Sequence, residues 1–174
     1  MPAAIAYEDA VDLLDGDHKL VQKLFIQYQT LREFGAPVAD RQMLAERICA
    51  ELTIHAQIEE EIFYPAVRKA TGNDALLDHA EHEHLEAKGL IARIQGMSPA
   101  EEGYDDCVKQ LAEAVMAHVM EERERVFLEA RYSPLDLRGL AMKLYERKNK
   151  LKKAAGGMPE LPVEKTPQQI EEHA

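Results

Sequence analysis

The sequence predicts an all-α protein, an antiparallel up-and-down four-helix bundle with an additional C-terminal helix and a flexible tail. Of its 174 residues, 46% are apolar but only 6% are aromatic, and tryptophan is absent, which favours helices over sheets. Apolar side chains also recur every three or four residues along four long segments joined by short loops. The length suits one core, so we predict a bundle domain over residues 1–153, which includes the additional helix, and a tail over residues 154–174.

The first two bundle helices are predicted from their apolar spacing and their end signals. The first spans residues 8–34 and ends at Gly35. Asp40 is expected to cap a second helix that runs to Thr71. Pro65 should kink its last turns, because proline cannot donate the backbone hydrogen bond that an α-helix needs there.

The third and fourth bundle helices have clearer start signals. Asn73 or Asp74 opens the third, which continues to Gly96. Residues 98–101 then combine a capping serine, a proline at the first helical position and a glutamate three residues on. We therefore expect a fourth helix from there to about Arg131, and an interruption near Gly103 is left open.

A fifth, shorter helix is expected over residues 133–152. Ser133-Pro134-Leu135-Asp136 repeats the start signal, and apolar side chains at Leu137, Leu140 and Leu144 need a surface to cover. Two placements are open at this stage, across one end of the bundle or against a partner.

Composition excludes several classes of function. A net charge of −11 repels nucleic-acid phosphates and anionic lipid, so we expect neither as a partner. No run of eighteen apolar residues or export segment occurs, which predicts a cytoplasmic protein. Cys49 and Cys107 lack a metal or redox spacing and are expected as free thiols. A monomer and a homodimer are both open.

Six polar residues interrupt the apolar faces of the four bundle helices: His18, His55, Glu59, His84, His118 and Glu122. His55 with Glu59, and His118 with Glu122, are each spaced four apart, so both members of a pair project from one helix face. Four helices therefore direct four imidazoles and two carboxylates toward the bundle axis.

Two buried carboxylates require positive charge between them, because unpaired burial of an ionised group is very costly. Imidazole and carboxylate suit iron, manganese or zinc, and carboxylates from facing helices can bridge two ions. Two histidines per ion, with Glu59 and Glu122 shared, would leave coordination positions open for a ligand. The HxxxE segments lie 37 and 34 residues after the single histidines, so two similar halves would build one roughly two-fold site.

At these residues the sequence resembles the hemerythrin-like HHE cation-binding domain family of non-haem di-iron four-helix bundles, over about residues 8–132. The motifs that carry the resemblance are Asp17-His18, His55-Ala56-Gln57-Ile58-Glu59-Glu60-Glu61-Ile62-Phe63-Tyr64-Pro65, Glu83-His84 followed by Ala87-Lys88, and His118-Val119-Met120-Glu121-Glu122.

The resemblance implies that His18, His55, His84 and His118 ligate iron and that Glu59 and Glu122 bridge it. The expected cofactor is a pair of iron ions with an oxo or hydroxo bridge; zinc or manganese is less favoured. Ala80 stands where oxygen carriers of the family have a further histidine, which favours turnover over reversible oxygen storage.

We therefore predict a protein that binds or reacts with dioxygen, peroxide or nitric oxide. Whether it is an enzyme is left open, with catalase-like peroxide decomposition and ferroxidase-like iron oxidation as candidate activities. The alternative is a non-enzymatic iron reservoir, or an iron or oxygen sensor acting through metal-dependent helix packing. A zinc-occupied or metal-free structural bundle is a third possibility.

Other polar residues of these motifs are expected outside the site. Solvated helix faces are predicted for His79, His82, Glu60, Glu61 and Glu121. Glu61 or Glu121 would supply an additional carboxylate to the site only if its helix were rotated about its axis. Tyr64 is expected to pack in the aromatic core, with donation of a hydrogen bond near the site as the alternative. Lys88 either reaches the cavity end or extends into water.

Overall fold

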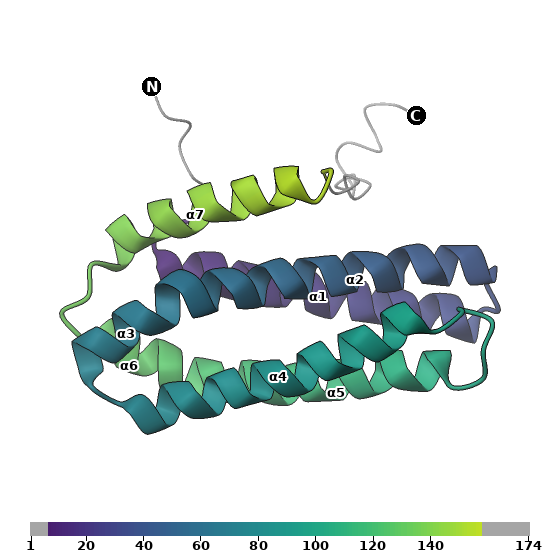
Figure 1. Ribbon diagram of the computed structural model, residues 1–174, viewed down its shortest axis with the longest axis horizontal. Helices are drawn as coiled ribbons and strands as arrows, with labels where there is room; N and C mark the ends of the chain where they lie inside the picture. Colours follow the sequence, from purple (N-terminus) through teal and green to yellow (C-terminus); the bar gives the residue numbers. More distant parts are fainter. Residues whose placement is uncertain (1–6, 158–174) are drawn as a thin grey trace, which may run out of the picture.

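Four antiparallel helices form the body of the molecule in the computed structural model, which describes residues 7–157 (Figure 1). They are α1 (Ala10–Glu33), α2 (Val38–Ile58), α4 (Asp74–Gly96) and α5 (Tyr104–Glu121). The described residues form helices and no strands, so the predicted fold class is confirmed. Most of the predicted tail, from residue 158 onward, lies outside the described residues.

The helix starts follow local hydrogen-bond chemistry. The Asp9 carboxylate accepts from the Asp12 N–H and caps α1, and the Asn73 side chain accepts from the Leu76 N–H and caps α4 as expected. The Asp40 cap was wrong. The helix α2 begins at Val38 without a side-chain cap, and Asp40 lies in its first turn, where its charge still favours the helix dipole.

The fourth bundle helix begins later than the sequence predicted, at Tyr104 rather than at Ser98. The Glu101 carboxylate accepts from the Ser98 N–H at 2.9 Å, and this contact closes a turn rather than a helix. Gly103 then has a φ of +91°, which breaks the helical path immediately before α5.

A wide π-helical turn begins at the glutamate of each HxxxE motif. These turns are η1 (Glu59–Phe63), which leads into α3 (Tyr64–Thr71), and η2 (Glu122–Val126), which leads into α6 (Phe127–Tyr132). The carbonyls of Glu59 and Glu122 accept from the N–H groups of Tyr64 and Phe127, five residues on.

The predicted kink at Pro65 is therefore a π turn that starts before the proline. Leu128 occupies the position in the second half that Pro65 occupies in the first, yet the same turn forms there. Proline is thus not required for it. Each turn begins at a glutamate of the site, which is a common location for π turns in proteins.

The additional helix α7 (Leu137–Ala154) lies lengthwise over α1 and α2, away from α4 and α5 (Figure 1). Asp136 caps it by accepting from the Gly139 N–H. Its buried Leu140 and Leu144 join the core, so neither a bundle end nor a partner is needed to cover them. Its Lys148 is also buried, which is unusual for a lysine.

Two apolar clusters occupy the two ends of the bundle interior. One contains Leu14, Phe63 and Phe127, and the other contains Leu24 and Leu111. The polar residues of the HxxxE motifs lie between these clusters, in a section where the apolar interior is interrupted.

The structure also bears on the cysteines and on membrane-spanning helices. Cys49 and Cys107 are free thiols, as expected, and both are buried. Within residues 7–157, no helix combines the length and apolarity that crossing a membrane requires.

Candidate metal centre

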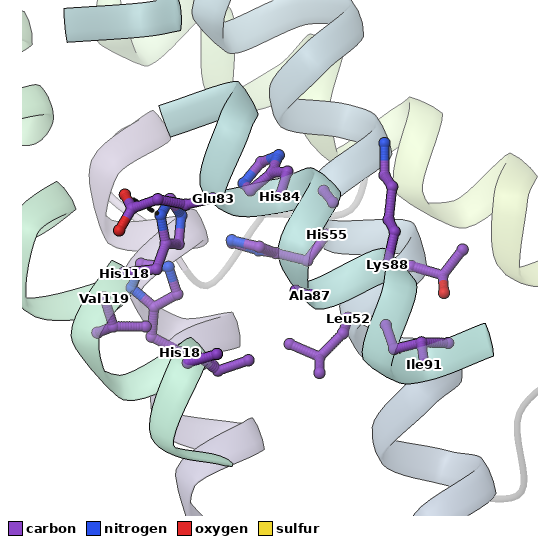
Figure 2. A pocket seen from close by; sticks show the side chains of 14 residues that line it. His18, Leu52, His55, Glu83, His84, Ala87, Lys88, Ile91, His118 and Val119 are labelled. Atoms are coloured by element: carbon purple, nitrogen blue, oxygen red, sulfur yellow. Dashed lines mark hydrogen bonds and ion pairs between the residues drawn. The ribbon is translucent and has the colours of Figure 1, made fainter. Parts of the chain in front are cut away.

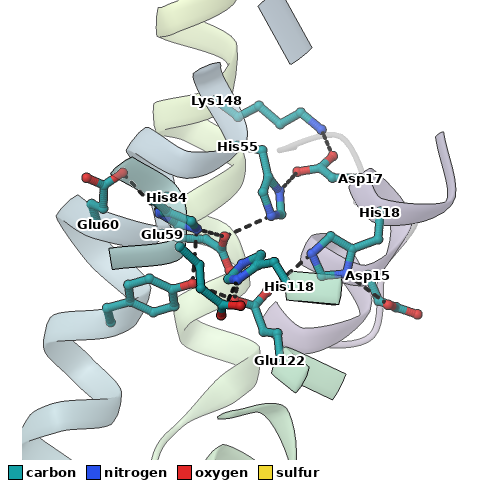
Figure 3. Close-up of polar contacts among 12 residues, drawn as sticks. Asp15, Asp17, His18, His55, Glu59, Glu60, His84, His118, Glu122 and Lys148 are labelled. Atoms are coloured by element: carbon teal, nitrogen blue, oxygen red, sulfur yellow. Dashed lines mark hydrogen bonds and ion pairs between the residues drawn. The ribbon is translucent and has the colours of Figure 1, made fainter. Parts of the chain in front are cut away.

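The structure brings the six predicted residues together in the middle of the bundle (Figure 3). The four histidines are buried, and Glu59 and Glu122 are almost completely inaccessible, at 0% and 1% exposure. The histidines come from α1, α2, α4 and α5, and the glutamates are the first residues of the two π turns. That these residues bind metal stays a prediction from the sequence.

The histidines form two pairs, one from each half of the chain. The ring centroids of His18 and His55 are 4.8 Å apart, and so are those of His84 and His118. The ring atoms nearest the centre of the site are Nε2 atoms. This arrangement provides two neighbouring positions, each with two imidazole nitrogens.

Each glutamate contacts one histidine of both pairs. Glu59 Oε1 lies 2.8 Å from His55 Nε2 and 3.3 Å from His84 Nε2. Glu122 places Oε1 3.2 Å from His18 Nε2 and Oε2 3.2 Å from His118 Nε2. Both carboxylates therefore span the two positions, as a bridging ligand must.

Several of these inner atoms form no hydrogen bond of normal geometry among residues 7–157, and the short contacts that they make are the ion pairs between these histidines and glutamates. The atoms are His18 Nε2, His55 Nε2, His118 Nε2, both carboxylate oxygens of Glu59, and Glu122 Oε1. Buried polar atoms without a well-formed hydrogen bond are expensive, which indicates that another group normally contacts them. Nitrogen and oxygen donors of this kind fit iron, manganese or zinc ions, so the residues present suit a pair of metal ions.

An outer carboxylate accepts a hydrogen bond from the Nδ1 atom of each histidine. The pairs are Asp15 with His18 at 3.2 Å, Asp17 with His55 at 2.9 Å, Glu60 with His84 at 3.2 Å, and Glu83 with His118 at 3.0 Å. A proton on Nδ1 leaves the Nε2 lone pair directed at the centre and fixes the ring orientation.

Three of these outer carboxylates are held in turn by a lysine or arginine. Arg123 donates to Asp15 at 2.6 Å, Lys88 donates to Glu60 at 2.7 Å, and Lys148 donates to Asp17. Although burial raises the pKa of Asp17, His55 and Lys148 lower it to about 2, so this carboxylate is ionised. The fourth carboxylate, Glu83, faces the imidazole of His79 at 3.8 Å.

Sequence reasoning missed part of this support. Glu60 was expected in solvent, but it accepts from His84 because α4 packs beside that face of the chain. Tyr64 was not missed: it is buried in the core, as expected, and its hydroxyl donates to Glu122 Oε2 at 2.5 Å, the hydrogen bond that the sequence left open as the alternative. Burial and the nearby carboxylates raise the pKa of Tyr64 well above its usual value, so the phenol keeps its proton.

Other expectations for the flanking residues are confirmed. His79 and His82 are exposed, as predicted. Lys88 is about half exposed and reaches the outer edge of the site through Glu60. A sequence signal existed for two outer carboxylates, because Asp17 and Glu83 each directly precede a histidine, yet each of them contacts a histidine of another helix.

Without metal, protons supply the positive charge at this site. Burial lowers the pKa of His118, but Glu122 and Glu59 outweigh it and raise this pKa to about 9. Burial raises the pKa of Glu122, yet His118 and His18 hold it well below its usual value. Metal ions would replace these protons and so compete with them.

Comparisons with known proteins agree with this geometry. The Hemerythrin HHE cation binding domain matches residues 9–130. A crystal structure of a Hemerythrin HHE cation binding domain-containing protein, the Rv2633c homolog from Mycobacterium kansasii, superposes with a TM-score of 0.70 at 25% identity, over 84% of this chain and 89% of that one.

A curated relative, a DNA nickase from Nostoc sp., is 34% identical over 119 residues. That match covers 67% of this chain but 32% of the relative, so this chain corresponds to about a third of that longer protein. The domain match, the bundle and the buried histidine and glutamate cluster agree, and the chain belongs to the hemerythrin HHE cation-binding domain family, whose members bind metal.

Proposed function

We propose that this chain holds two iron ions and reacts there with a small ligand, namely dioxygen, peroxide or nitric oxide. The observation that carries the proposal is a small cavity lined by all four histidines (Figure 2). Iron bound by neutral imidazoles and carboxylates supplies open coordination positions and electrons for such a ligand.

The walls of this cavity restrict what reaches the histidines. Its other lining residues are mainly apolar, including Leu52, Ala87, Ile91, Ala114, Val115 and Val119. An apolar wall disfavours entry of large or charged molecules, because they would lose hydration without compensating contacts. Small uncharged molecules are therefore the ligand class that fits.

Hydrogen bonds from the surrounding residues fix the orientation of the side chains of the site. Tyr64 keeps one oxygen of Glu122 hydrogen-bonded, and the outer carboxylates keep the imidazoles oriented. Ala80 is buried beside His118 and Glu122 and adds no ligand. With four histidines, we favour turnover, such as peroxide decomposition or iron oxidation, over reversible oxygen storage.

The test is metal analysis of the purified chain together with visible absorption spectra before and after aeration. We expect two irons per chain and new absorption bands when oxygen, peroxide or nitric oxide is added to the reduced protein. A single zinc per chain, or an iron-loaded protein whose spectrum ignores all three ligands, would overturn the proposal.

A second candidate is an iron sensor that acts through helix packing. It is favoured by Lys148, which connects α7 to His55 through Asp17. In that case removal of the ions should weaken α7 packing, measurable as faster amide exchange at Leu140 and Leu144. Unchanged exchange after chelation, together with loss of the spectral response, would favour the first proposal.

Nucleic acid is not part of the proposed function. The Nostoc relative is named for DNA nicking, but this chain covers 32% of it. The net charge of −11 also opposes binding to phosphate groups.

A further inference from the structure

A second group of metal-binding side chains lies near the surface, outside the central site. His79 and Glu83 project from α4 and meet Glu121 from α5, and one ligand atom from each lies within 4.8 Å of the other two. His79 Nε2 is 3.0 Å from a Glu121 oxygen and 3.8 Å from Glu83 Oε1. Their side chains are 52%, 19% and 28% exposed in the order His79, Glu83, Glu121, so solvent reaches the group.

The charge balance at this group differs from that at the other outer carboxylates. Asp15, Asp17 and Glu60 each pair with a lysine or arginine. Within residues 7–157, the ion-pair partners of Glu83 and Glu121 are imidazoles. Two carboxylates that face one surface imidazole leave negative charge that a divalent cation would neutralise.

The same group lies directly outside the central site. Glu83 Oε1 accepts from His118 Nδ1 at 3.0 Å (Figure 2). The same oxygen lies 3.8 Å from His79 Nε2, so one carboxylate contacts both the outer imidazole and a predicted central ligand. A narrow crevice is lined by His79, Glu83 and Glu121 together with His118 and Glu122. Glu122 is 1% exposed, and its Oε1 lies 3.2 Å from His18 Nε2, so this residue belongs to the central site and marks where the crevice meets it.

We propose that His79, Glu83 and Glu121 form an outer site for a divalent cation such as Fe²⁺, Mn²⁺ or Zn²⁺, from which ions enter the central site. One imidazole and two carboxylates from adjacent helices supply three ligands, and exposure leaves the remaining positions to water. The entry role rests on the proposed central metal pair, whereas cation binding at the outer site can be measured separately.

The binding test uses iron-loaded chain titrated with Mn²⁺, with free Mn²⁺ followed by electron paramagnetic resonance. We expect one additional ion per chain, bound at least 10-fold more weakly by the His79→Ala and Glu121→Gln variants. His82→Ala is the matched control, because His82 is exposed on the same helix and does not belong to the group. No additional ion, or equal binding by all variants, would overturn the outer site.

The entry role is tested by the rate at which metal-free chain takes up Fe²⁺. We expect His79→Ala and Glu121→Gln to slow uptake several-fold while the final central iron content stays at the wild-type value. Equal rates would overturn the entry role. Failure of the wild-type chain to retain two irons would instead contradict the proposed function, so the two failures are distinguishable.

Discussion

The two halves of the chain build the same inner site but support it differently. The inner residues correspond in pairs, His18 with His84, His55 with His118, and Glu59 with Glu122. The outer carboxylates Asp17 and Glu83 also correspond, because each precedes a histidine and contacts the histidine of the following bundle helix.

The difference lies in what covers each half. Helix α7 lies over α1 and α2, and its buried Lys148 neutralises Asp17 away from solvent. In the described residues no helix covers α4 and α5 in this way, and Glu83 meets His79 near the surface. The inner residues thus share one two-fold arrangement. The partners of the outer carboxylates differ between the halves, because α7 covers one half and solvent reaches the other.

The comparison predicts the largest effects for the two glutamates, with similar size in both halves. Glu59→Gln and Glu122→Gln each remove a carboxylate that faces both histidine pairs. We expect metal affinity to fall by roughly 100-fold or more, measured by competition with a chelator, since even supporting residues contribute 10- to 100-fold. The exposed Glu86→Gln is the control. If either variant kept the metal affinity of the wild type, the two glutamates would not have equivalent roles in the two halves.

Replacement of the buried Lys148 should lower the free energy of unfolding more than replacement of its exposed counterpart in the second half. Lys148→Met leaves the Asp17 carboxylate buried with less compensation, and we expect a loss of about 3 kcal/mol in the free energy of unfolding. His79→Ala, the counterpart in the second half, should cost less than about 1 kcal/mol because it is exposed. Urea unfolding measures both, with Lys150→Met as an exposed control on α7. Equal losses would contradict the role assigned to α7.

The outer carboxylates should affect metal binding unequally. Asp17→Asn is expected to lower metal affinity toward the upper end of a roughly 10- to 100-fold range. Glu83→Gln should act toward the lower end, because water can replace its partly exposed carboxylate. Chelator competition on the two purified variants gives the comparison, and the reverse order would show that burial does not decide it.

The metal-free chain should lose stability as the pH rises. The pKa of His118 is about 9 in the folded chain against about 6.5 in a free side chain, where Glu122 is absent. This contribution is complete below pH 6.5 and is lost as the pH rises to about 9, by at most about 1.4 kcal/mol per pH unit for one histidine. Thermal melts of chelated protein across this range should decline, and His118→Gln should reduce the slope. A flat profile would contradict the coupling of His118 to Glu122.

The smallest effect is expected for the ion pair between Lys88 and Glu60, which lies at the surface beside His84. Lys88→Ala removes a contact to Glu60 from a half-exposed side chain, which should change stability by less than about 1 kcal/mol. Chemical denaturation of this variant and wild type tests it. A loss of stability as large as that of Lys148→Met would mean that the difference in exposure between Lys88 and Lys148 does not decide how much each contributes.

Much of the fold and the inner site was readable from the sequence. Helical spacing places His55 and Glu59 on one face of one helix, and apolar neighbours show that this face is buried. The same reasoning located His18, His84 and the second HxxxE motif. It succeeded because each inference concerned the periodicity of a single helix.

The turns were harder to predict. Ser98 and Glu101 resemble a helix start, but Gly103 ends the turn in a left-handed conformation. The π turns at Glu59 and Glu122 leave no proline signature common to both halves. Local patterns of this kind fit more than one backbone path, and packing selects between them.

The sequence by itself determined which residues face the bundle interior, because that depends on the angle between successive side chains of one helix. Only the tertiary structure decided that Asp17 supports His55, that Glu60 supports His84, and that Lys148 of α7 reaches the first half. These contacts join different helices. They depend on the rotation and spacing of packed helices, which no periodicity within one segment specifies.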